Sequence, residues 1–180
     1  MTSLRSDAAR SRARILDAAR AVPSETLRLN DLARDTGLGV GTVYRHFPTV
    51  ISLLEALNED ALVELEELSR GVTESASPAT AFVELIQRGT ELQISRDGLR
   101  DVLISGDVSP ETRRLRDSFR RSATIGLQAA IAEGRIRPDV SMEQIQRLVC
   151  GVEYAVRLGE GKDRALMLEI MLAGLELRPR

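Results

Sequence analysis

The sequence is poor in the side chains on which most enzymes and metal proteins depend. Its 180 residues include one cysteine, one histidine and no tryptophan. With Cys150 alone, an internal disulfide cannot form. With His46 alone, neither a histidine-based catalytic triad nor a His/Cys metal cluster can be assembled. The sequence therefore predicts a protein that is not an enzyme and that uses no metal and no cofactor.

Long apolar runs are also missing. No stretch approaches the roughly 18 apolar residues of a membrane span, and the N-terminus lacks the apolar segment of a signal peptide. We therefore expect a soluble protein of the bacterial cytoplasm, with no membrane partner. The hydrophobic share of 43% is typical of a globular chain and argues against a disordered one.

The formal charge is nearly balanced but unevenly distributed. The chain carries a net −2, yet its first 50 residues hold eight arginines against five acidic residues. The remainder holds 17 basic and 22 acidic residues. A basic head on an acidic body is the asymmetry expected of a nucleic-acid-binding segment joined to a scaffold. Because the basic excess of the head is small, chance is the alternative explanation.

Helical periodicity dominates the sequence. Apolar residues recur every three to four positions and no segment reads as a strand, so we expect an all-α protein of about nine helices. Ser77-Pro78 and Ser109-Pro110 mark helix starts, and a capping box at residues 141–144 marks another. The predicted helices span residues 6–22, 30–36, 39–47, 49–69, 78–94, 97–105, 110–133, 141–158 and 162–176.

Residues 36–48 read TGLGVGTVYRHFP and raise the question of a phosphate-binding loop. A dinucleotide-binding loop would need glycine where Thr42 stands, and no apolar strand precedes the segment. The Gly-Lys-Ser/Thr of a P-loop is absent as well. Two short helices joined by a glycine-containing turn favour a helix-turn-helix instead. In that motif, the second helix enters the major groove of DNA.

The second short helix carries the side chains that such a role needs. Thr42 and Tyr44 offer hydroxyl groups to phosphates, and Arg45 can pair with a phosphate or fork onto guanine. Val40 can contact a thymine methyl group. The single histidine, His46, is either a phosphate contact or a solvated residue at the helix end. Glycines at 39 and 41 allow close approach to a sugar-phosphate backbone.

The sequence resembles the N-terminal domain of TetR-family transcriptional regulators. The resemblance lies in residues 15–19 (ILDAA), 29–33 (LNDLA) and 37–49 (GLGVGTVYRHFPT), and it covers about residues 8–58. It implies nine helices, a homodimer formed by the last two long helices, and a helical pocket whose ligand loosens the grip on DNA. The resemblance also suggests a DNA-binding domain at residues 1–48 and an effector-binding and dimerisation domain at residues 49–180.

Four positions depart from the family pattern. Pro23 replaces the aromatic residue that often ends the first helix, and Arg28 stands where a Ser or Thr often caps the second helix. Gly39 replaces a capping Ser, and Val50 replaces a lysine that commonly meets a phosphate. Each departure can lower the affinity for DNA. The predicted DNA-contacting residues are Arg14, Gly39, Val40, Gly41, Thr42, Tyr44, Arg45, His46 and Thr49.

Two apolar stripes near the C-terminus predict the dimer interface. They could form half of a four-helix contact between subunits, or they could be buried within one subunit. The predicted interface residues are Met142, Ile145, Val149, Val152, Val156, Leu166 and Ile170. The arginines of residues 110–133 suggest a solvated face more readily than a second nucleic-acid surface.

Inward-facing residues of the middle helices are candidates for an effector pocket. Most of them can equally be plain core, and Tyr154 stands out because a buried phenol needs a hydrogen-bond partner. The candidate residues are Phe82, Ile86, Leu99, Leu103, Phe119, Ala123, Cys150 and Tyr154. So apolar a set predicts a small, mostly hydrophobic effector.

Together these features predict a ligand-responsive transcriptional regulator. We expect a homodimeric repressor that binds a palindromic, double-stranded DNA operator, works at the nucleoid and is released by its effector. An activator has the same sequence features. The alternative function is a helical small-molecule-binding or interaction protein without operator-specific DNA binding.

Overall fold

The computed structural model describes residues 2–176, which fall into two compact units. The first unit contains the chain up to residue 59 together with residues 97–112. The second unit contains residues 60–96 and the chain from residue 113 onward. This packing division differs from the predicted domain boundary after residue 48, and the functional division at that residue stays a prediction.

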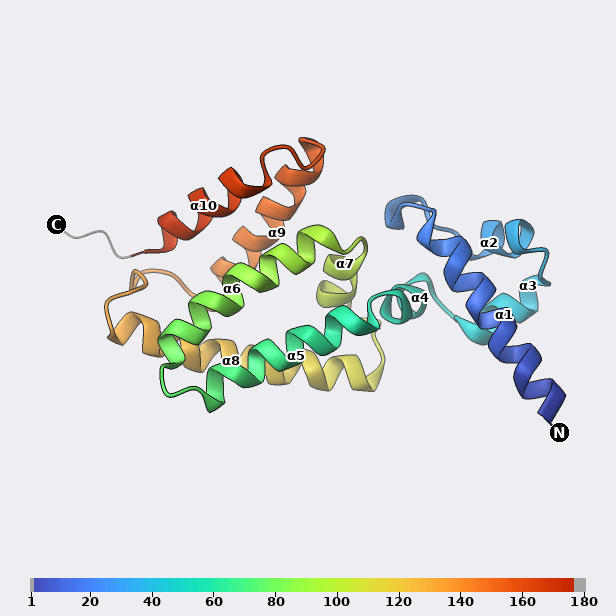
Figure 1. Cartoon of the computed structure of the whole chain (residues 1–180), viewed down its shortest axis with the longest axis horizontal. Helices are drawn as coiled ribbons and strands as arrows, with labels where there is room; N and C mark the ends of the chain where they lie inside the picture. The colour runs from blue at the N-terminus through green and yellow to red at the C-terminus, as the bar shows by residue number, and fades with distance from the viewer. Residues whose placement is uncertain (1, 177–180) are drawn as a thin grey trace. The chain divides into compact units, whose positions relative to one another are not determined.

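Between residues 2 and 176 the chain forms ten α-helices, one short 3-10 helix and no strand, which confirms the all-α prediction (Figure 1). The helices are α1 (Thr2–Arg20), η1 (Ser24–Thr26), α2 (Leu29–Thr36), α3 (Val40–His46), α4 (Val50–Leu57), α5 (Glu59–Glu74), α6 (Pro78–Ser95), α7 (Leu99–Ile104), α8 (Pro110–Ala132), α9 (Met142–Leu158) and α10 (Arg164–Leu175).

The tenth helix arises because the predicted helix at residues 49–69 is broken at Asn58. Asn58 is 2% exposed, and its backbone leaves helical geometry at φ −111°, ψ 17°. Its side-chain amide donates to the carbonyl of Leu54 at 3.0 Å and to that of Asp97 at 3.1 Å. Asn58 therefore ends α4 and ties that end to the segment that follows α6.

The first unit is built around the inner faces of α1, α2, α3 and α4 (Figure 1). Ile15 and Ala19 of α1 pack with Leu32 of α2 and Val43 of α3, and all four are at most 2% exposed. Leu53 of α4 completes this core. Ile15 and Ala19 lie one turn apart on the same face of α1, and this face packs against the two short helices.

Asp97 links three segments of the first unit. Its carboxylate accepts hydrogen bonds from the backbone N–H of Ser24 at 2.6 Å and from the Ser24 hydroxyl at 2.8 Å. Its carbonyl accepts the Asn58 amide. Gly98 follows with φ 76°, and a Cβ atom there would stand 2.7 Å from Leu54. This contact cluster, Ser24–Asn58–Asp97, joins η1, the end of α4 and the start of α7.

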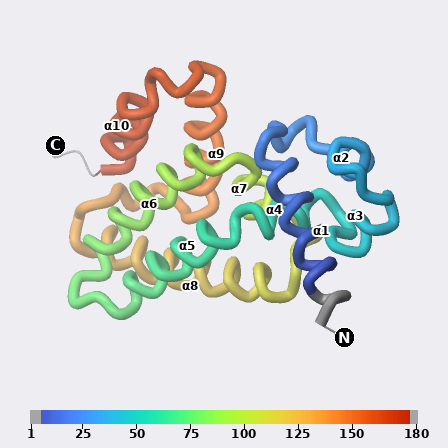
Figure 2. Tube along the Cα trace, turned by 45° about the vertical axis from the view of Figure 1, so that its right-hand side comes forward, coloured from blue at the N-terminus to red at the C-terminus, as the bar shows by residue number. Residues whose placement is uncertain are grey.

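In the second unit α5, α6 and the body of α8 lie side by side (Figures 1 and 2). Gly126 of α8 lies close to both neighbours, since a Cβ atom there would stand 2.7 Å from Val72 of α5 and 2.8 Å from Phe82 of α6. α9 and α10 pack against α6. The chain after α8 meets the end of α10 through an antiparallel bridge between Ile136 and Glu176.

Candidate nucleic-acid interface and ligand cavity

The turn between α2 and α3 has the geometry of a helix-turn-helix. Gly37 adopts the left-handed conformation at φ 63°, ψ 23°. The N–H of Leu38 donates a hydrogen bond to the carbonyl of Ala33 at 3.0 Å, and the N–H of Gly37 donates one to the carbonyl of Arg34 at 3.1 Å. This arrangement is typical of a helix that ends at a glycine. α3 begins three residues later at Val40. A side chain at Gly37 would be strained, so the sequence selects this turn locally.

One face of α3 is anchored in the core of the first unit. Val43 is fully buried and Phe47, directly after the helix, is 2% exposed. No side chain caps the N-terminus of α2 or of α3. Arg28 precedes α2 and Gly39 precedes α3, and neither makes a capping hydrogen bond. The position of α3 therefore depends on its apolar anchors more than on its ends.

The opposite face of α3 is open to solvent. Val40 is 51% exposed and Tyr44 43%, although both side chains are large and largely apolar. Arg45 is exposed and Thr42 is partly exposed, while Gly39 and Gly41 leave bare backbone beside them. A surface that combines an aromatic hydroxyl, a threonine and a guanidinium is suited to phosphate and base-edge contacts.

Arg45 lies back along its own helix. Its Nε donates to the carbonyl of Gly41 at 3.0 Å, and one terminal nitrogen donates to the Thr42 hydroxyl at 3.3 Å. A guanidinium held in this way keeps further N–H donors for a phosphate. A bidentate contact with guanine would require it to release the helix first.

Two of the predicted DNA-contacting residues have structural partners. The Arg14 guanidinium donates to the carbonyl of Thr36, at the C-terminal end of α2. The Thr49 hydroxyl accepts the N–H of Ser52 at 3.0 Å in the capping box of α4. Both contacts stabilise helix ends, and a role of either residue toward DNA stays a prediction.

A basic residue beside α3 was not selected from the sequence. The Arg12 guanidinium lies 5.4 Å from the centre of the Phe47 ring. The centres of the His46 and Phe47 rings lie 6.4 Å apart. Among the described residues, no carboxylate forms an ion pair with Arg12 or Arg45. Arg12 is in register with Ile15 and Ala19 of α1, and that spacing could have identified it.

Substituting Gly41 by alanine should stabilise the fold and at the same time weaken DNA binding. A Cβ atom at Gly41 would meet nothing within 4 Å, so no contact within the chain explains a glycine inside α3. We expect Gly41→Ala to raise the free energy of unfolding by up to about 1 kcal/mol, because alanine favours helix. We also expect it to weaken DNA binding about tenfold or more, because the methyl group obstructs close approach.

Chemical denaturation and fluorescence anisotropy with operator DNA measure these two effects. Gly71→Ala is the matched control, since Gly71 lies in α5 and its Cβ position is equally open. The control should gain similar stability and leave DNA affinity unchanged. If Gly41→Ala binds DNA as tightly as the parent, the backbone at this position does not approach DNA.

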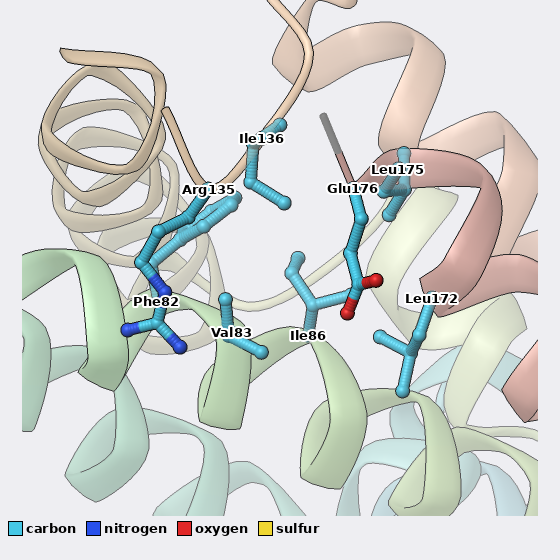
Figure 3. A pocket seen from close by; sticks show the side chains of 8 residues that line it. All are labelled: Phe82, Val83, Ile86, Arg135, Ile136, Leu172, Leu175 and Glu176. Atoms are coloured by element: carbon cyan, nitrogen blue, oxygen red, sulfur yellow. The ribbon is translucent and has the colours of Figure 1, made fainter. Parts of the chain in front are cut away.

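The second unit contains a cavity of about 220 Å³ beside α6 (Figure 3). Two of the predicted pocket residues, Phe82 and Ile86, line it. The remaining lining residues were not predicted; they are Val83, Arg135, Ile136, Leu172, Leu175 and Glu176. They come from three separate segments that only the fold brings together, at the Ile136–Glu176 bridge.

The other predicted pocket residues do not line this cavity. Leu99 and Leu103 belong to α7 in the first unit. Phe119 and Ala123 pack in the core of the second unit.

Cys150 and Tyr154, the last two predicted pocket residues, do not line the cavity either. The Cys150 sulfur lies 3.8 Å from the side-chain amide of Gln93. The expectation that Tyr154 is a buried phenol is wrong, because its side chain is 52% exposed. α9 turns that position toward solvent.

The predicted interface stripe of α9 faces its own core. Ile145 and Val156 are 1% and 3% exposed, and the core of the second unit includes Ile145. Met142, Val149 and Val152 pack against the same core. Since α9 is apolar on two sides, periodicity alone could not tell which side is internal. Ile145 and Val156 are therefore buried within their own subunit, whereas Met142, Val149 and Val152 are half-exposed, and their place in a dimer interface stays a prediction.

A different apolar face of α9 and α10 is exposed. On α9 it contains Leu148 and Leu158, 40% and 70% exposed, with Gly151 between them. On α10 it contains the predicted residues Leu166 and Ile170, 51% and 58% exposed. These residues, together with Ala155, Ala173 and Gly174, are called the α9–α10 apolar face below.

Two absences hold for the part of the chain that the structure describes. None of its helices combines the length and apolarity needed to cross a bilayer. No three or more of its histidine, cysteine, aspartate and glutamate residues gather in a way that could hold a metal ion.

Comparison with known proteins places this chain among transcriptional regulators. The model of the C-terminal domain of SbtR-like transcriptional regulators, a TetR-type domain, matches residues 77–177, more than half of the chain. The HTH-type transcriptional regulator UidR of Escherichia coli (strain K12) is 23% identical over 87% of this chain and 84% of its own length.

Solved structures agree with this assignment. The TetR transcriptional regulator SCO0520 from Streptomyces coelicolor is 29% identical, with a TM-score of 0.51 over 93% of this chain and 99% of its own. AmtR from Mycobacterium smegmatis shares the fold with a TM-score of 0.64 at 22% identity, over 94% of this chain and 87% of its own. The proteins of this group are transcriptional regulators and not enzymes. The chain belongs to the TetR family of transcriptional regulators.

Proposed function

We propose that this regulator binds a palindromic operator as a homodimer, represses transcription, and is released by a small molecule. The observation that carries the proposal is the outward face of α3, where Thr42, Tyr44 and Arg45 stand on a helix fixed by Val43 and Phe47. A dimer that covers its operator excludes other proteins from that DNA, so repression needs no further contact surface. The protein would then act in the cytoplasm, at the nucleoid.

The α9–α10 apolar face is the proposed dimer interface. Soluble monomers rarely leave several large apolar side chains exposed together. The small residues Gly151, Ala155 and Gly174 beside them allow helices of two subunits to approach closely. A two-fold contact of this kind pairs each face with its own copy. It would present two α3 helices to half-sites about one helical turn apart.

The dimer proposal makes a prediction for Ile170. We expect Ile170→Asp to raise the dimer dissociation constant about 30-fold or more, because a carboxylate buried at an interface has no partner. Sedimentation equilibrium measures the change. Val63→Asp is the matched control, since Val63 is 50% exposed on α5, outside the proposed interface. A variant that stays as dimeric as its parent would place the interface elsewhere.

The cavity beside α6 is the proposed effector site. Phe82 and Ile86 line it from α6, and Asp97 follows that helix by two residues. A ligand that shifts α6 would move Asp97, and with it the Ser24–Asn58–Asp97 cluster that holds η1 and the end of α4. Such a ligand changes DNA affinity only as far as it binds the two arrangements differently.

Retention of genomic DNA fragments in a mobility-shift assay tests the function. Specific retention that weakens steeply with added salt supports an operator-binding protein. Equal, weak retention of all fragments favours the alternative, a helical small-molecule-binding protein without operator specificity. A reporter gene measured with and without the regulator separates repression from activation.

A further inference from the structure

The cavity beside α6 has an apolar floor and is also lined by two side chains of opposite charge, Arg135 and Glu176. Its floor is formed by Phe82, Val83, Ile86 and apolar residues of α10. Figure 3 shows the Arg135 guanidinium and the Glu176 carboxylate on opposite sides of Val83 and Ile86. The two charged groups are contributed by the segment after α8 and by the residue that follows α10.

Within residues 2–176, no side chain of opposite charge pairs with either Arg135 or Glu176, and the two form no ion pair with each other. The Arg135 guanidinium is held in place by the hydroxyl of Thr80, at 2.5 Å.

The neighbouring Arg137 differs from Arg135 in this respect. Its guanidinium bonds Asp139 at 2.6 and 2.7 Å, and this contact lowers the pKa of the Asp139 carboxyl. Of the two arginines in this segment, Arg135 alone brings an uncompensated charge to the cavity.

We propose that the cavity binds a small apolar zwitterion, specifically an α-amino acid with an aliphatic or aromatic side chain. The carboxylate of the ligand would meet Arg135, its ammonium would meet Glu176, and its side chain would cover Val83 and Ile86. This proposal names the ligand class of the effector site and so rests on the proposed function.

The size of the cavity fits this class. Its volume of about 220 Å³ lies below the ~300–1,000 Å³ of sites for drug-sized ligands. A free amino acid is of that size. Arg135 and Glu176 are both exposed at the rim, and a zwitterion can form a charge-assisted hydrogen bond with each of them, whereas a ligand with one charge can form only one.

Isothermal titration calorimetry of the full chain with L-leucine tests the proposal. Two analogues serve as probes: 4-methylpentanoate, which lacks the ammonium, and 3-methylbutylamine, which lacks the carboxylate. We expect saturable binding of leucine and affinities lower by about tenfold or more for either analogue. L-Isoleucine, L-valine, L-methionine and L-phenylalanine complete the series, since the pocket shape selects among side chains.

Charge-neutral variants assign the two ends of the ligand. Arg135→Gln and Glu176→Gln should each weaken binding of the preferred amino acid about tenfold or more. Glu176→Gln should leave binding of 4-methylpentanoate unchanged or improved, because it removes a facing negative charge. Arg147→Gln is the matched control, since Arg147 is an exposed arginine of α9 that pairs with Glu143, and it should bind as the parent does.

Two results would overturn the proposal. One is the absence of binding for all five amino acids at millimolar concentrations by a folded parent. The other is binding that neither rim variant changes. DNA release is measured separately by anisotropy with operator DNA. An amino acid that binds as expected but leaves the DNA complex intact upholds the site and contradicts its role as the effector site.

Discussion

Replacing Arg45 by alanine should weaken operator binding by at least about 30-fold and by as much as about twenty-thousandfold. A good contact from an arginine is worth roughly 1–3 kcal/mol, and a two-fold dimer loses it at both half-sites. The loss is then about 2–6 kcal/mol, at about 1.4 kcal/mol for each factor of ten. The fold should not change, because Arg45 is exposed and bonds only to its own helix.

The pattern of loss identifies what Arg45 contacts. A phosphate contact predicts weaker binding to all sequences and a smaller salt slope, whereas a guanine contact predicts relaxed preference at one base pair. Arg20→Ala is the control, because it removes an equal charge from α1 and leaves α3 unchanged. Arg20 pairs with Asp17 of its own helix. Thr42→Ala and Tyr44→Phe should show smaller losses. If affinity and salt slope both stay unchanged in Arg45→Ala, Arg45 does not contact DNA.

Replacing Asp97 by alanine should lower the free energy of unfolding by about 2–4 kcal/mol. The Asp97 carboxylate accepts both the N–H and the hydroxyl of Ser24, which is 7% exposed. Hydrogen bonds to a charged group contribute about 1.5–3 kcal/mol, and an unsatisfied buried N–H adds its own cost. Chemical denaturation measures the loss, which should be among the largest for a single polar residue in the first unit.

Two further variants show whether the effect belongs to this contact. Ser24→Ala removes the hydroxyl bond but keeps the N–H bond, so it should cost less than Asp97→Ala. Asp139→Ala removes a fully exposed carboxylate that pairs with Arg137, and it should leave the free energy of unfolding essentially unchanged. Equal stability of Asp97→Ala and the parent would mean that solvent replaces the Ser24 bonds at no cost.

The helix-turn-helix was predictable because its determinants are local. Gly37 needs a left-handed conformation, Pro48 ends a helix, and the apolar positions of α1 repeat at helical spacing. Each of these signals lies within a few residues of the structure it specifies. The outward side chains of α3 followed directly, since burial of Val43 orients the rest of so short a helix.

The features that sequence reasoning missed depend on distant partners. The break at Asn58 requires the carbonyl of Asp97, which lies 39 residues away. The choice between the two apolar sides of α9 depends on where α6 packs, so Ile145 was assigned to the wrong surface. Arg135 and Glu176 line one cavity only because the chain after α8 meets the end of α10.

Directed cleavage of operator DNA tests the central claim, that the outward face of α3 lies against duplex DNA in a two-fold dimer. Cys150 is the only cysteine, so Val40→Cys in a Cys150→Ser background places a single iron chelate on α3. Val63→Cys in the same background is the control, at a similarly exposed position of α5. The account predicts two cleavage clusters, symmetric and about one helical turn apart, for the first protein and none for the second. Cleavage that is absent for Val40→Cys, or equal for both proteins, would contradict it.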